Sequence, residues 1–414
     1  MRLLIVSQYF WPENFRVNDL VTGLARRGHE ITVLTALPNY PEGKIFPEFR
    51  REPSRFSRYE GATIVRIPIV TRGTSGMRLL LNYLSFVLTA ASLGAWRLRR
   101  IPFDAIVVFQ PSPITSCLPA ILIGRLKRAP VLLWVLDLWP QTLSAVGVVR
   151  APWLLALVGR LVAFIYRRCD LVLAQSRAFV PGIEKYLRDP SRVRYFPGWA
   201  EPLFRGSLDA VEPAPEVRGL QDTFNILFAG NIGEAQDFPA ILDAAEMLRQ
   251  RTDIRWLIVG GGRAAEWVRR EIRRRELDDN VRMLGRHPIE RMPSFFRAAG
   301  ALLVTLKSDP VFAMTIPGKV QTYLATGLPV IGALDGEGAR VLKRSGAALV
   351  CPSGDGAGLA ERVVQLASLP PSERTAMGAR GLEYSGQEFD RDRLLTQLEA
   401  WIRDLTSSQG VNAP

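Results

Sequence analysis

Histidine and cysteine are scarce in this chain of 414 residues, and their scarcity argues against several kinds of site. The two histidines, His29 and His287, are too few for a histidine metal cluster and offer little to a Ser-His-Asp triad. The three cysteines, Cys117, Cys169 and Cys351, lie far apart and include no Cys-x-x-Cys pair. An odd, scattered set is typical of a reducing compartment. We therefore expect neither a metal centre nor a disulfide framework.

We expect no signal peptide, because the first residues do not show its pattern. The segment MRLLIVSQYF reads at once as a folded strand, its apolar run is short, and no cleavage site follows. Hydrophobic residues make up 48% of the chain and charged residues 22%, which is typical of a globular protein. A chain of this length exceeds one comfortable core, so we expect two domains.

The positive charge is concentrated in the first half of the chain. The net charge is +13; residues 1–200 hold 27 Lys and Arg against 12 Asp and Glu, whereas residues 201–414 hold 26 against 28. A basic half indicates an anionic partner, namely lipid headgroups, a phosphorylated substrate or nucleic acid. The alternative is an arginine-rich composition on solvated faces, but such a bias should raise both halves equally.

Short apolar strands alternate with amphipathic helices along both halves, which predicts βαβ units and parallel sheets. We expect an α/β protein with two Rossmann-like domains facing a cleft, and ligands at the carboxyl ends of the strands. The first domain is predicted over 1–200 and the second over 222–390. Residues 201–221 are polar and rich in proline, which predicts a linker. Residues 391–414 are predicted to form a helix that packs back on the first domain, followed by a tail.

Two apolar segments interrupt this alternation. Leu79–Trp96 is an 18-residue segment without charge that arginines bracket, and Trp153–Tyr166 is a second apolar helix. The first segment has three interpretations: a transmembrane helix, a buried core helix, or a helix on the membrane surface. Flanking arginines and a tryptophan at one end favour the surface helix, and hence a monotopic membrane protein.

The segment 312–330, FAMTIPGKVQTYLATGLPV, predicts a phosphate site. A turn with Pro317 and Gly318 precedes Lys319 at the start of a helix, where backbone N–H groups and the helix dipole favour an anion. Glycines after two other predicted strands, in 228–237 and 260–262, would let a ligand approach the backbone, although turns of such domains commonly need glycine. Lys319 could also be a surface lysine, but a cation at a helix N-terminus is unfavourable unless an anion is present.

Together these motifs resemble a known family. The motifs are LARRGHEITVLT (24–35), DLWPQTLSAVGV (137–148), LVLAQS (171–176), FAGNIGEAQDF (228–238), VRMLGRHPIERMPSFF (281–296) and PGKVQTYLATGLPVIGA (317–333). In this order, and nearly end to end, they resemble the retaining, nucleotide-sugar-dependent glycosyltransferases of family 4, which have the GT-B fold. The sequences of the second-domain motifs are most similar to those of an O-antigen and capsule branch that includes N-acetylfucosamine transferases.

The resemblance implies a donor site on the second domain. The base would lie near 285–287, held largely by backbone groups, and the diphosphate would meet the turn before Lys319. The residues so implied are Gly230, Asn231, Ile232, Gly233, Arg286, His287, Pro317, Gly318, Lys319 and Thr322. The chain departs from the family pattern, because Met314 and Thr322 stand where most members carry a pair of glutamates, and Asn231 and Gln236 replace an arginine and a lysine. Lys319, Gln236 and Asp137 are the candidate catalytic residues.

The acceptor side is predicted on the first domain. The loop 8–16 follows the first strand and should line the cleft, so Glu13 and Asn14 could orient the acceptor hydroxyl; a solvated loop is the alternative. Asn39 lies in a Pro-Asn-Tyr-Pro turn that could act as a lid. Asp137 ends another strand and could serve as a base or electrostatic partner, or else as a helix N-cap.

The function expected from this resemblance is retaining transfer of a sugar, such as an N-acetylated deoxysugar, from a nucleotide diphosphate, with a UDP-sugar expected, to a polyprenyl-diphosphate-linked acceptor in surface polysaccharide synthesis. The leaving phosphate would assist the incoming hydroxyl, so that positioning and charge stabilisation do most of the work, without a cofactor or metal. The expected location is the cytoplasmic face of the inner membrane, on anionic lipid, with no nucleic acid partner. A catalytically silent nucleotide-sugar-binding partner and a sugar-nucleotide epimerase are the alternatives.

Overall fold

The computed structural model describes residues 1–73, 75–145, 151–206, 208–220 and 222–411. The chain divides into two compact units: unit 1 is Met1–Pro197 with Asp392–Pro414, and unit 2 is Gly198–Arg391. Some predicted segments fall partly outside the described residues. These are 146–148 of the motif over 137–148, positions 207 and 221 of the predicted linker, and 412–414 of the tail.

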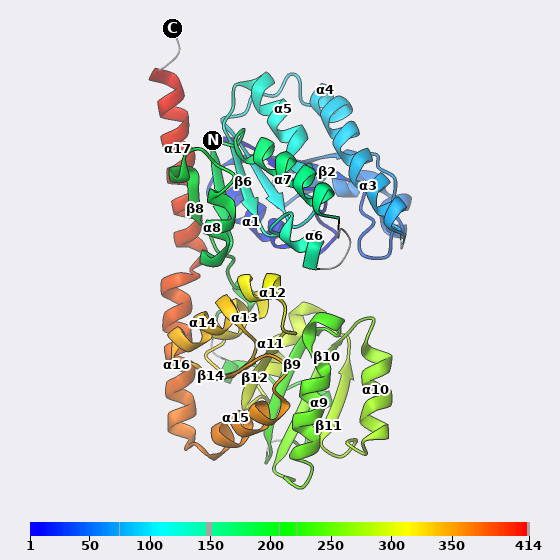
Figure 1. The fold of residues 1–414 in the computed structure, drawn as a ribbon, viewed down its shortest axis with the longest axis vertical. Coiled ribbons are helices and arrows are strands. Elements are labelled where there is room, and N and C mark those ends of the chain that lie inside the picture. The colour runs from blue at the N-terminus through cyan, green and yellow to red at the C-terminus, as the bar shows by residue number, and fades with distance from the viewer. Residues whose placement is uncertain (74, 146–150, 207, 221, 412–414) are drawn as a thin grey trace. The chain divides into compact units, whose positions relative to one another are not determined.

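Unit 1 is built on an eight-stranded sheet in the order β3-β4-β2-β1-β5-β6-β7-β8 (Figure 1). All neighbouring strands are parallel except the short β3, which pairs antiparallel with β4. The strands are β1 (Arg2–Val6), β2 (Glu30–Ala36), β3 (Arg58–Tyr59), β4 (Ala62–Ile67), β5 (Ala105–Gln110), β6 (Val131–Val135), β7 (Leu171–Ala174) and β8 (Val193–Tyr195). The central strands are buried along their whole length, as strands covered on both faces should be.

Helices cover both faces of this sheet. They are α1 (Arg16–Arg26), α2 (Pro47–Arg51), α3 (Gly76–Thr89), α4 (Ala95–Arg97), α5 (Cys117–Lys127), α6 (Gln141–Ala145), α7 (Pro152–Tyr166) and α8 (Val180–Glu184). A π-helical turn, η2 (Ala90–Gly94), joins α3 to α4, so that one continuous helix runs over Gly76–Arg97. α5 contacts both α3 and α7, and the three helices therefore share one face of the sheet.

The helix over Gly76–Arg97 is long and apolar enough to cross a membrane by length and composition, yet only 22% of its most apolar window is buried. Met77, Leu88 and Trp96 are between 58% and 68% exposed. The interpretation of this segment as a buried core helix is therefore wrong. Asn82 on its inner side is fully buried and accepts a hydrogen bond from Gln8 at 2.7 Å, which ties the helix to the loop after β1.

The C-terminal helix α17 (Arg391–Val411) packs on unit 1, as predicted. Apolar residues of α17 such as Leu395 and Ile402 are buried, and Trp401 packs edge-to-face on Phe196 at 6.0 Å. Its Glu399 lies 2.8 Å from the ring nitrogen of His29, at the end of the α1–β2 turn. The chain thus returns to its first unit after completing the second.

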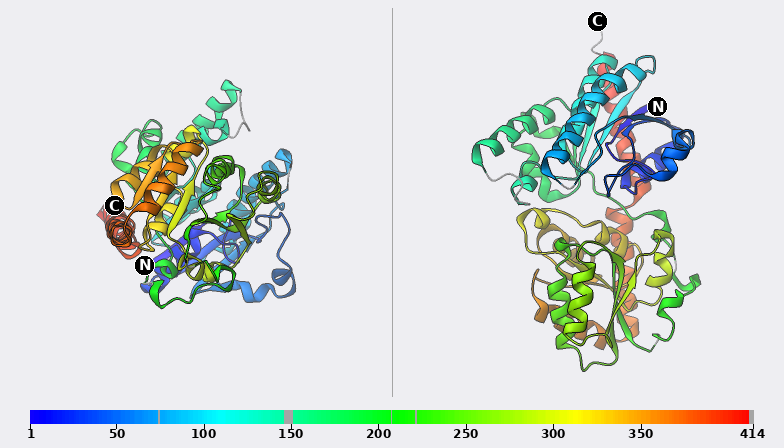
Figure 2. Two further views of the ribbon diagram at one scale, coloured as in Figure 1. Left: turned by 90° about the horizontal axis from the view of Figure 1, so that it is seen from below. Right: turned by 90° about the vertical axis from the view of Figure 1, so that its right-hand side faces the viewer.

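Unit 2 is built on a six-stranded parallel sheet in the order β11-β10-β9-β12-β13-β14 (Figures 1 and 2). The strands are β9 (Phe224–Asn231), β10 (Ile254–Gly261), β11 (Val281–Gly285), β12 (Ala301–Thr305), β13 (Val330–Ala333) and β14 (Ala348–Cys351). The helices are α9 (Phe238–Met247), α10 (Ala265–Arg274), α11 (Met292–Phe296), α12 (Pro310–Met314), α13 (Gly318–Leu324), α14 (Gly336–Ser345), α15 (Gly356–Ser368) and α16 (Pro371–Glu388). One apolar cluster packs on each face of the sheet, so both faces are covered.

The predicted linker is not a free connection. Phe204, Ala214, Val217 and Leu220 are at most 4% exposed and belong to the cluster that also contains residues of β9 and β12. Phe204 and Val217 lie in short 3-10 turns, while Ala214 and Leu220 lie in the irregular chain beside them, which explains why the segment shows no clear periodicity. The segment is a covering layer of unit 2.

Candidate functional site

The carboxyl ends of β9 and β10 in unit 2 meet backbone to backbone. Gly230 and Gly260 have φ of 136° and 150°, a region that L side chains rarely adopt. A Cβ on Gly260 would lie 1.8 Å from the carbonyl oxygen of Gly230, and one on Gly262 would lie 2.4 Å from that of Ile232. Glycine is therefore required at these positions, and next to them the exposed Asn231 carries the side chain at the end of β9.

Lys319 reaches this edge from the first turn of α13. A Cβ on Gly230 would lie 2.8 Å from Lys319 Cε, so the glycine makes room for the lysine. Lys319 Nζ donates to Gln236 Oε1 at 2.7 Å and lies 3.4 Å from the ring centroid of Phe228. The structure thus brings together Gly230, Gln236 and Lys319, three of the residues that the sequence singled out.

The Lys319 ammonium is buried, while the residue as a whole is half-buried. Burial lowers the pKa of Lys319 well below its ordinary value, because the cation has lost its hydration. No carboxylate of the described residues forms an ion pair with it; its partners are an amide oxygen and an aromatic face. An anion near Lys319 would supply the counter-charge that the described side chains do not.

Tyr323 fixes the position of Lys319, and the sequence reasoning missed it. The Tyr323 hydroxyl bonds the backbone of Ala229 on β9, at 3.0 Å from its nitrogen and 3.2 Å from its oxygen. Lys319 and Tyr323 are four residues apart, so they share one face of α13. The i, i+4 spacing of a lysine and a tyrosine was the available signal.

The helix predicted after the Pro317-Gly318 turn is α13, and a further short helix, α12, precedes the turn. α12 is capped by Asp309, whose carboxylate accepts from the N–H groups of Val311 and Phe312, and α13 begins after Pro317. α13 has seven residues, so its dipole is small and Lys319 carries most of the positive charge. Gly318 is exposed and Thr322 is half-buried on α13.

The loop after β9 is held by contacts that the sequence did not reveal. Thr305 Oγ1 donates to the Gln236 carbonyl oxygen, and Lys307 N donates to that of Ala235 at 3.0 Å. Asp237 adopts a left-handed conformation, with φ of 46°, and accepts from Gly354 N at 2.9 Å. These bonds keep Gln236 in place beside Lys319.

Asn231, Ile232 and Gly233, which were predicted to contact the donor, follow one another at this edge and differ in exposure. Asn231 is exposed, and its side-chain nitrogen would be 2.5 Å from a Cβ on Gly233. The Ile232 side chain is fully buried, and its N–H and carbonyl bond Gly261 and Ala264. A donor role for Ile232 through its side chain is therefore wrong.

Arg286 and His287 follow β11 and differ in their contacts. Arg286 is exposed, with its Cβ 3.7 Å from the Cβ position of Gly261. His287 Nε2 donates to the Leu284 carbonyl at 2.8 Å, and Nδ1 accepts from Arg291. Both ring nitrogens are thus used within the fold, and any hydrogen bond from His287 to a base has to come from its backbone.

In unit 1, Glu13 and Asn39 are structural, contrary to the predicted acceptor role. The Glu13 carboxylate accepts from the N–H groups of Phe10, Asn39 and Tyr40 at 2.7–3.1 Å, and burial raises its pKa. Asn39 is 1% exposed and bonds the backbone of Leu37 and Arg72. These two side chains join the loop after β1 to the turn after β2. Neither is available to an acceptor.

Asn14 and Asp137 remain candidates on this unit. Asn14 is exposed in the loop after β1. Asp137 follows β6 and accepts from Thr142 Oγ1 at 2.5 Å and Trp139 Nε1 at 3.2 Å. Burial raises the pKa of Asp137, and these hydrogen bonds oppose that shift. The carboxylate therefore holds its own loop, whatever else it contacts.

Aromatic residues dominate the carboxyl edge of the unit 1 sheet. Tyr9, Phe15 and Tyr40 have ring centroids 5.1–5.2 Å apart, and Arg72 donates to the Tyr9 hydroxyl at 3.2 Å. Both amide atoms of Gln110, fully buried at the end of β5, lack a hydrogen-bond partner among the described residues. The density of aromatics in QYFWPENF was the signal for this cluster.

Two family models match the chain, one on each half. Residues 14–199 match the glycosyl transferase 4-like domain, and residues 223–368 match glycosyl transferases group 1. Among curated proteins, the chain is 27% identical over 341 residues to WcaI of Escherichia coli (strain K12), described provisionally as a colanic acid biosynthesis glycosyl transferase; the match covers 79% of this chain and 82% of WcaI. It is 24% identical to WbjE of Pseudomonas aeruginosa, a provisionally described glycosyltransferase, over 67% of this chain and 70% of WbjE.

Solved structures share the fold at low identity. The Anabaena protein HepE, solved with UDP and glucose, superposes with a TM-score of 0.69 at 13% identity, covering 97% of this chain and 99% of that one. Sucrose-phosphate synthase from Thermosynechococcus elongatus superposes with a TM-score of 0.72 at 15% identity, covering 98% and 99%. With one Rossmann-like unit matched by each family model, the chain belongs to the group 1, family 4-like glycosyltransferases of GT-B fold.

Proposed function

We propose that this glycosyltransferase transfers a sugar from a UDP-sugar to a lipid-linked saccharide, with retention at the anomeric carbon, during synthesis of a bacterial surface polysaccharide. The observation that carries the proposal is the buried Lys319, which lacks a carboxylate partner among the described residues and lies beside the strand-end glycines Gly230 and Gly260. A nucleotide diphosphate supplies the missing negative charge. The similarity to WcaI, described as a colanic acid biosynthesis glycosyl transferase, and to HepE, solved with UDP, supports this choice of reaction and donor.

The chemistry needs few protein groups. The leaving diphosphate develops negative charge as the glycosidic bond breaks, and Lys319 is placed to stabilise it, with Gln236 holding the ammonium. In retaining transfer without a protein nucleophile, a leaving-group oxygen assists deprotonation of the incoming hydroxyl. Thr322 and backbone groups would then hold the ribose, since Thr322 stands where a glutamate is usual in the family.

A location on the cytoplasmic face of the membrane is part of the proposal. α3, α5 and α7 expose large apolar side chains on one face of unit 1, among them Leu84, Leu126 and Trp153 at 46%, 66% and 71% exposure. Buried Asn82 ties α3 to the fold, which favours a helix on the membrane surface over one that leaves the unit to cross it. The enzyme would meet its lipid-linked acceptor at the membrane surface.

The test begins with donor binding. Isothermal titration calorimetry with UDP, ADP, GDP and dTDP should give binding for UDP, and a panel of UDP-sugars with a lipid-linked acceptor should give a product whose anomeric configuration, read by NMR, matches the donor. Inversion would refute the retaining mechanism. No binding of any nucleotide and no transfer across the panel would refute the function.

A second candidate is a catalytically silent donor-binding partner. Met314 and Thr322, which replace the usual glutamate pair, favour it because neither side chain can act as a carboxylate. UDP-sugar binding without transfer, and without donor hydrolysis, would establish this alternative. Conversion of the donor sugar without any acceptor would instead indicate an epimerase.

A further inference from the structure

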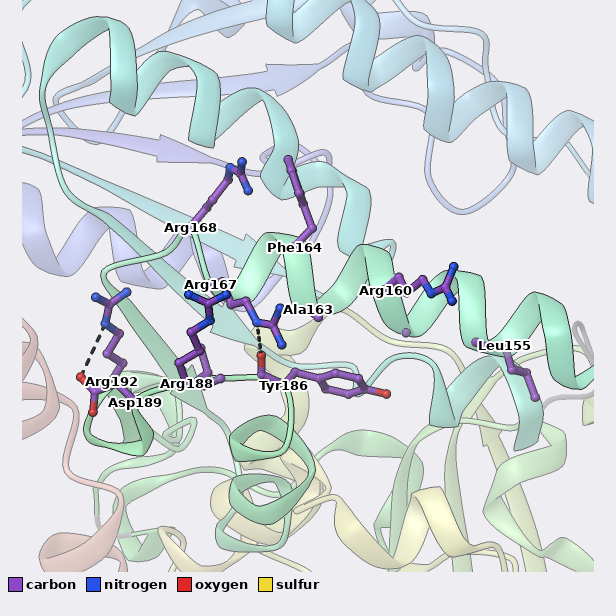
Figure 3. A pocket seen from close by; sticks show the side chains of 13 residues that line it. Leu155, Arg160, Ala163, Phe164, Arg167, Arg168, Tyr186, Arg188, Asp189 and Arg192 are labelled. Carbon is purple, nitrogen blue, oxygen red and sulfur yellow. Dashed lines mark hydrogen bonds and ion pairs between the residues drawn. The ribbon is translucent and has the colours of Figure 1, made fainter.

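A pocket in unit 1, away from the candidate acceptor residues, joins arginines to an apolar wall (Figure 3). It has a volume of about 850 Å³ and lies between α7 and the segment 186–192, which leads into β8. Gly159 lets the two elements approach, because a Cβ there would lie 3.3 Å from the Tyr186 hydroxyl. Figure 3 shows Arg188 reaching up from the lower segment toward the end of α7, beside Arg167.

The charge of this pocket is strongly unbalanced. Its lining contains five arginines and one acidic residue, Asp189. Asp189 lies 3.8 Å from Arg192, and Arg167 donates to the Tyr186 carbonyl at 3.0 Å, so both of these arginines have a local role. Within the described part of the chain, Arg160, Arg168 and Arg188 form no ion pair. Three exposed guanidinium groups around one hollow attract an anion with several oxygen acceptors, such as a phosphate.

The other wall of the pocket is apolar and continues onto the exposed side of α7. Leu155, Ala156 and Phe164 line the hollow, and the guanidinium carbon of Arg168 lies 3.8 Å from the Phe164 ring centroid. Beyond the pocket, Trp153 and Leu157 on the same helix are 71% and 55% exposed. A ligand that matches both walls has a phosphate at one end and hydrocarbon at the other.

Most of the pocket lies toward the amino edge of the sheet, opposite the edge that carries Asp137. Asp170 N donates to Val131 O at the start of β6, so the end of α7 lies at the amino edge of the sheet. Segment 186–192 leads into the start of β8 at this same edge. Asp137 and the aromatic cluster lie at the carboxyl edge. Arg168 and Arg188 lie at this amino edge, whereas Arg160 lies midway along the 15 residues of α7, about 12 Å from the start of the helix. The arginine cluster is therefore centred away from the carboxyl edge, where the acceptor is expected to react.

We infer that this pocket binds the phosphate headgroup of an anionic membrane phospholipid, with the acyl chains along the exposed apolar side of α7. The inference rests on the proposed membrane location of the enzyme and adds a headgroup site to it. The apolar wall is the reason for choosing a lipid over a free phosphate or a nucleic acid. Such a site would hold unit 1 on anionic membrane while leaving its carboxyl edge free for the acceptor.

The test compares vesicle binding of matched variants of the full-length protein. The variant R160A/R168A/R188A removes the three arginines without an ion pair, and R50A/R51A/R55A removes three exposed arginines of the same unit on and beside α2. Co-sedimentation uses neutral phosphatidylcholine vesicles and vesicles containing phosphatidylglycerol. Thermal unfolding and UDP binding of each variant check that it is folded.

The wild type should bind phosphatidylglycerol vesicles more tightly than neutral ones. The affinity of the pocket variant for phosphatidylglycerol vesicles should be about a hundredfold lower, since each basic residue near an anionic surface contributes roughly fivefold. The α2 variant should change by less than fivefold. Asp189→Asn removes the acidic residue of the pocket while keeping an acceptor for Ser191, and should raise anionic binding about fivefold.

Each other result decides against the inference in its own way. Equal losses of anionic-vesicle affinity in the two triple variants would show that the net positive charge of unit 1, and not this pocket, causes the preference. Equal binding of the wild type to neutral and anionic vesicles would refute the headgroup site but leave the membrane location standing, whereas no binding to either would refute both. Abolition of the preference by millimolar glycerol phosphate or inorganic phosphate would identify a free-phosphate site instead.

Discussion

Replacing Lys319 with methionine should stabilise unit 2 and weaken nucleotide binding, two effects of opposite sign from one change. Methionine has a chain of similar length without the ammonium. The wild-type ammonium is buried against Phe228 and Gln236, and its partners among the described residues include no carboxylate. The folded protein without ligand therefore holds a cation that water would solvate better.

The expected gain in the free energy of unfolding is about 1–2 kcal/mol. Replacing buried ionic groups with apolar residues of similar volume commonly stabilises by about 1–4 kcal/mol. Against this stand the lost hydrogen bond to Gln236, about 1 kcal/mol, and part of the cation–π contact. Gln236 is half-buried, so water can replace its lost partner.

The gain should depend on pH in a defined direction. Burial lowers the pKa of Lys319 in the folded protein, so folding favours the neutral amine. The destabilisation is therefore smallest above the unfolded pKa of about 10.4 and grows as the pH falls toward the folded pKa. The difference between the variant and the wild type in urea denaturation should be larger at pH 7 than at pH 10.

The loss of UDP affinity should be ten- to a hundredfold. A hydrogen bond from a charged group contributes about 1.5–3 kcal/mol, and each 1.4 kcal/mol is a factor of ten. Calorimetry in buffers of different ionisation enthalpy should also show less proton uptake on UDP binding by the variant than by the wild type. That difference isolates Lys319 from the titration of the nucleotide.

Lys343→Met is the matched control, since this lysine is exposed in the last turn of α14. It should change stability by less than about 0.5 kcal/mol and leave UDP binding as it is. The reasoning is refuted if Lys319→Met destabilises the protein by more than about 1 kcal/mol while UDP affinity is unchanged. Lys319 would then stabilise the fold without binding the nucleotide.

Three further predictions concern unit 1. Glu13→Ala should lower the free energy of unfolding by about 2–5 kcal/mol, because it leaves three backbone N–H groups without their acceptor; an altered KM for the acceptor at unchanged urea midpoint would restore its predicted contact with substrate. Glu399→Ala should destabilise by about 1–3 kcal/mol by breaking its contact with His29. Because its hydrogen bond from His29 and neighbouring positive charge outweigh burial and lower the pKa of Glu399, that loss should shrink as the pH falls below about 4.3, and a constant difference down to pH 3 would contradict the assignment. Cys169 should resist a thiol reagent at pH 8 until urea is added, since the Cys117 contact and burial raise its pKa; rapid reaction of the folded protein would show that the pair is accessible.

Short-range chemistry explains the predictions that the structure confirmed. The alternation of apolar strands and helices predicted two parallel α/β units, because period and turn residues act within a few positions. The apolar side chains of α17 likewise predicted a helix whose apolar side is buried against the rest of the chain. In the segment 317–333, a proline and a glycine before a lysine predicted the turn that opens α13.

The wrong predictions concern residues whose partners lie far along the chain. Glu13 is a polar residue in a loop after a strand, a pattern that fits a substrate contact as well as a structural one. Its partners at Asn39 and Tyr40 lie 26 and 27 positions away, and only the pairing of β1 with β2 brings them near. Segment 201–221 was similarly misjudged, because its buried residues follow the surface of unit 2 and no regular period.

The sequence by itself determined the α/β alternation, the glycines at the strand ends and the presence of a lysine after the Pro-Gly turn. The tertiary structure decided that this lysine lies beside Gln236, 83 positions away, with Phe228 below it. It also gathered arginines of α7 and of segment 186–192 around one hollow. Periodicity is a property of neighbouring residues, whereas the burial of a charge depends on every element that packs around it.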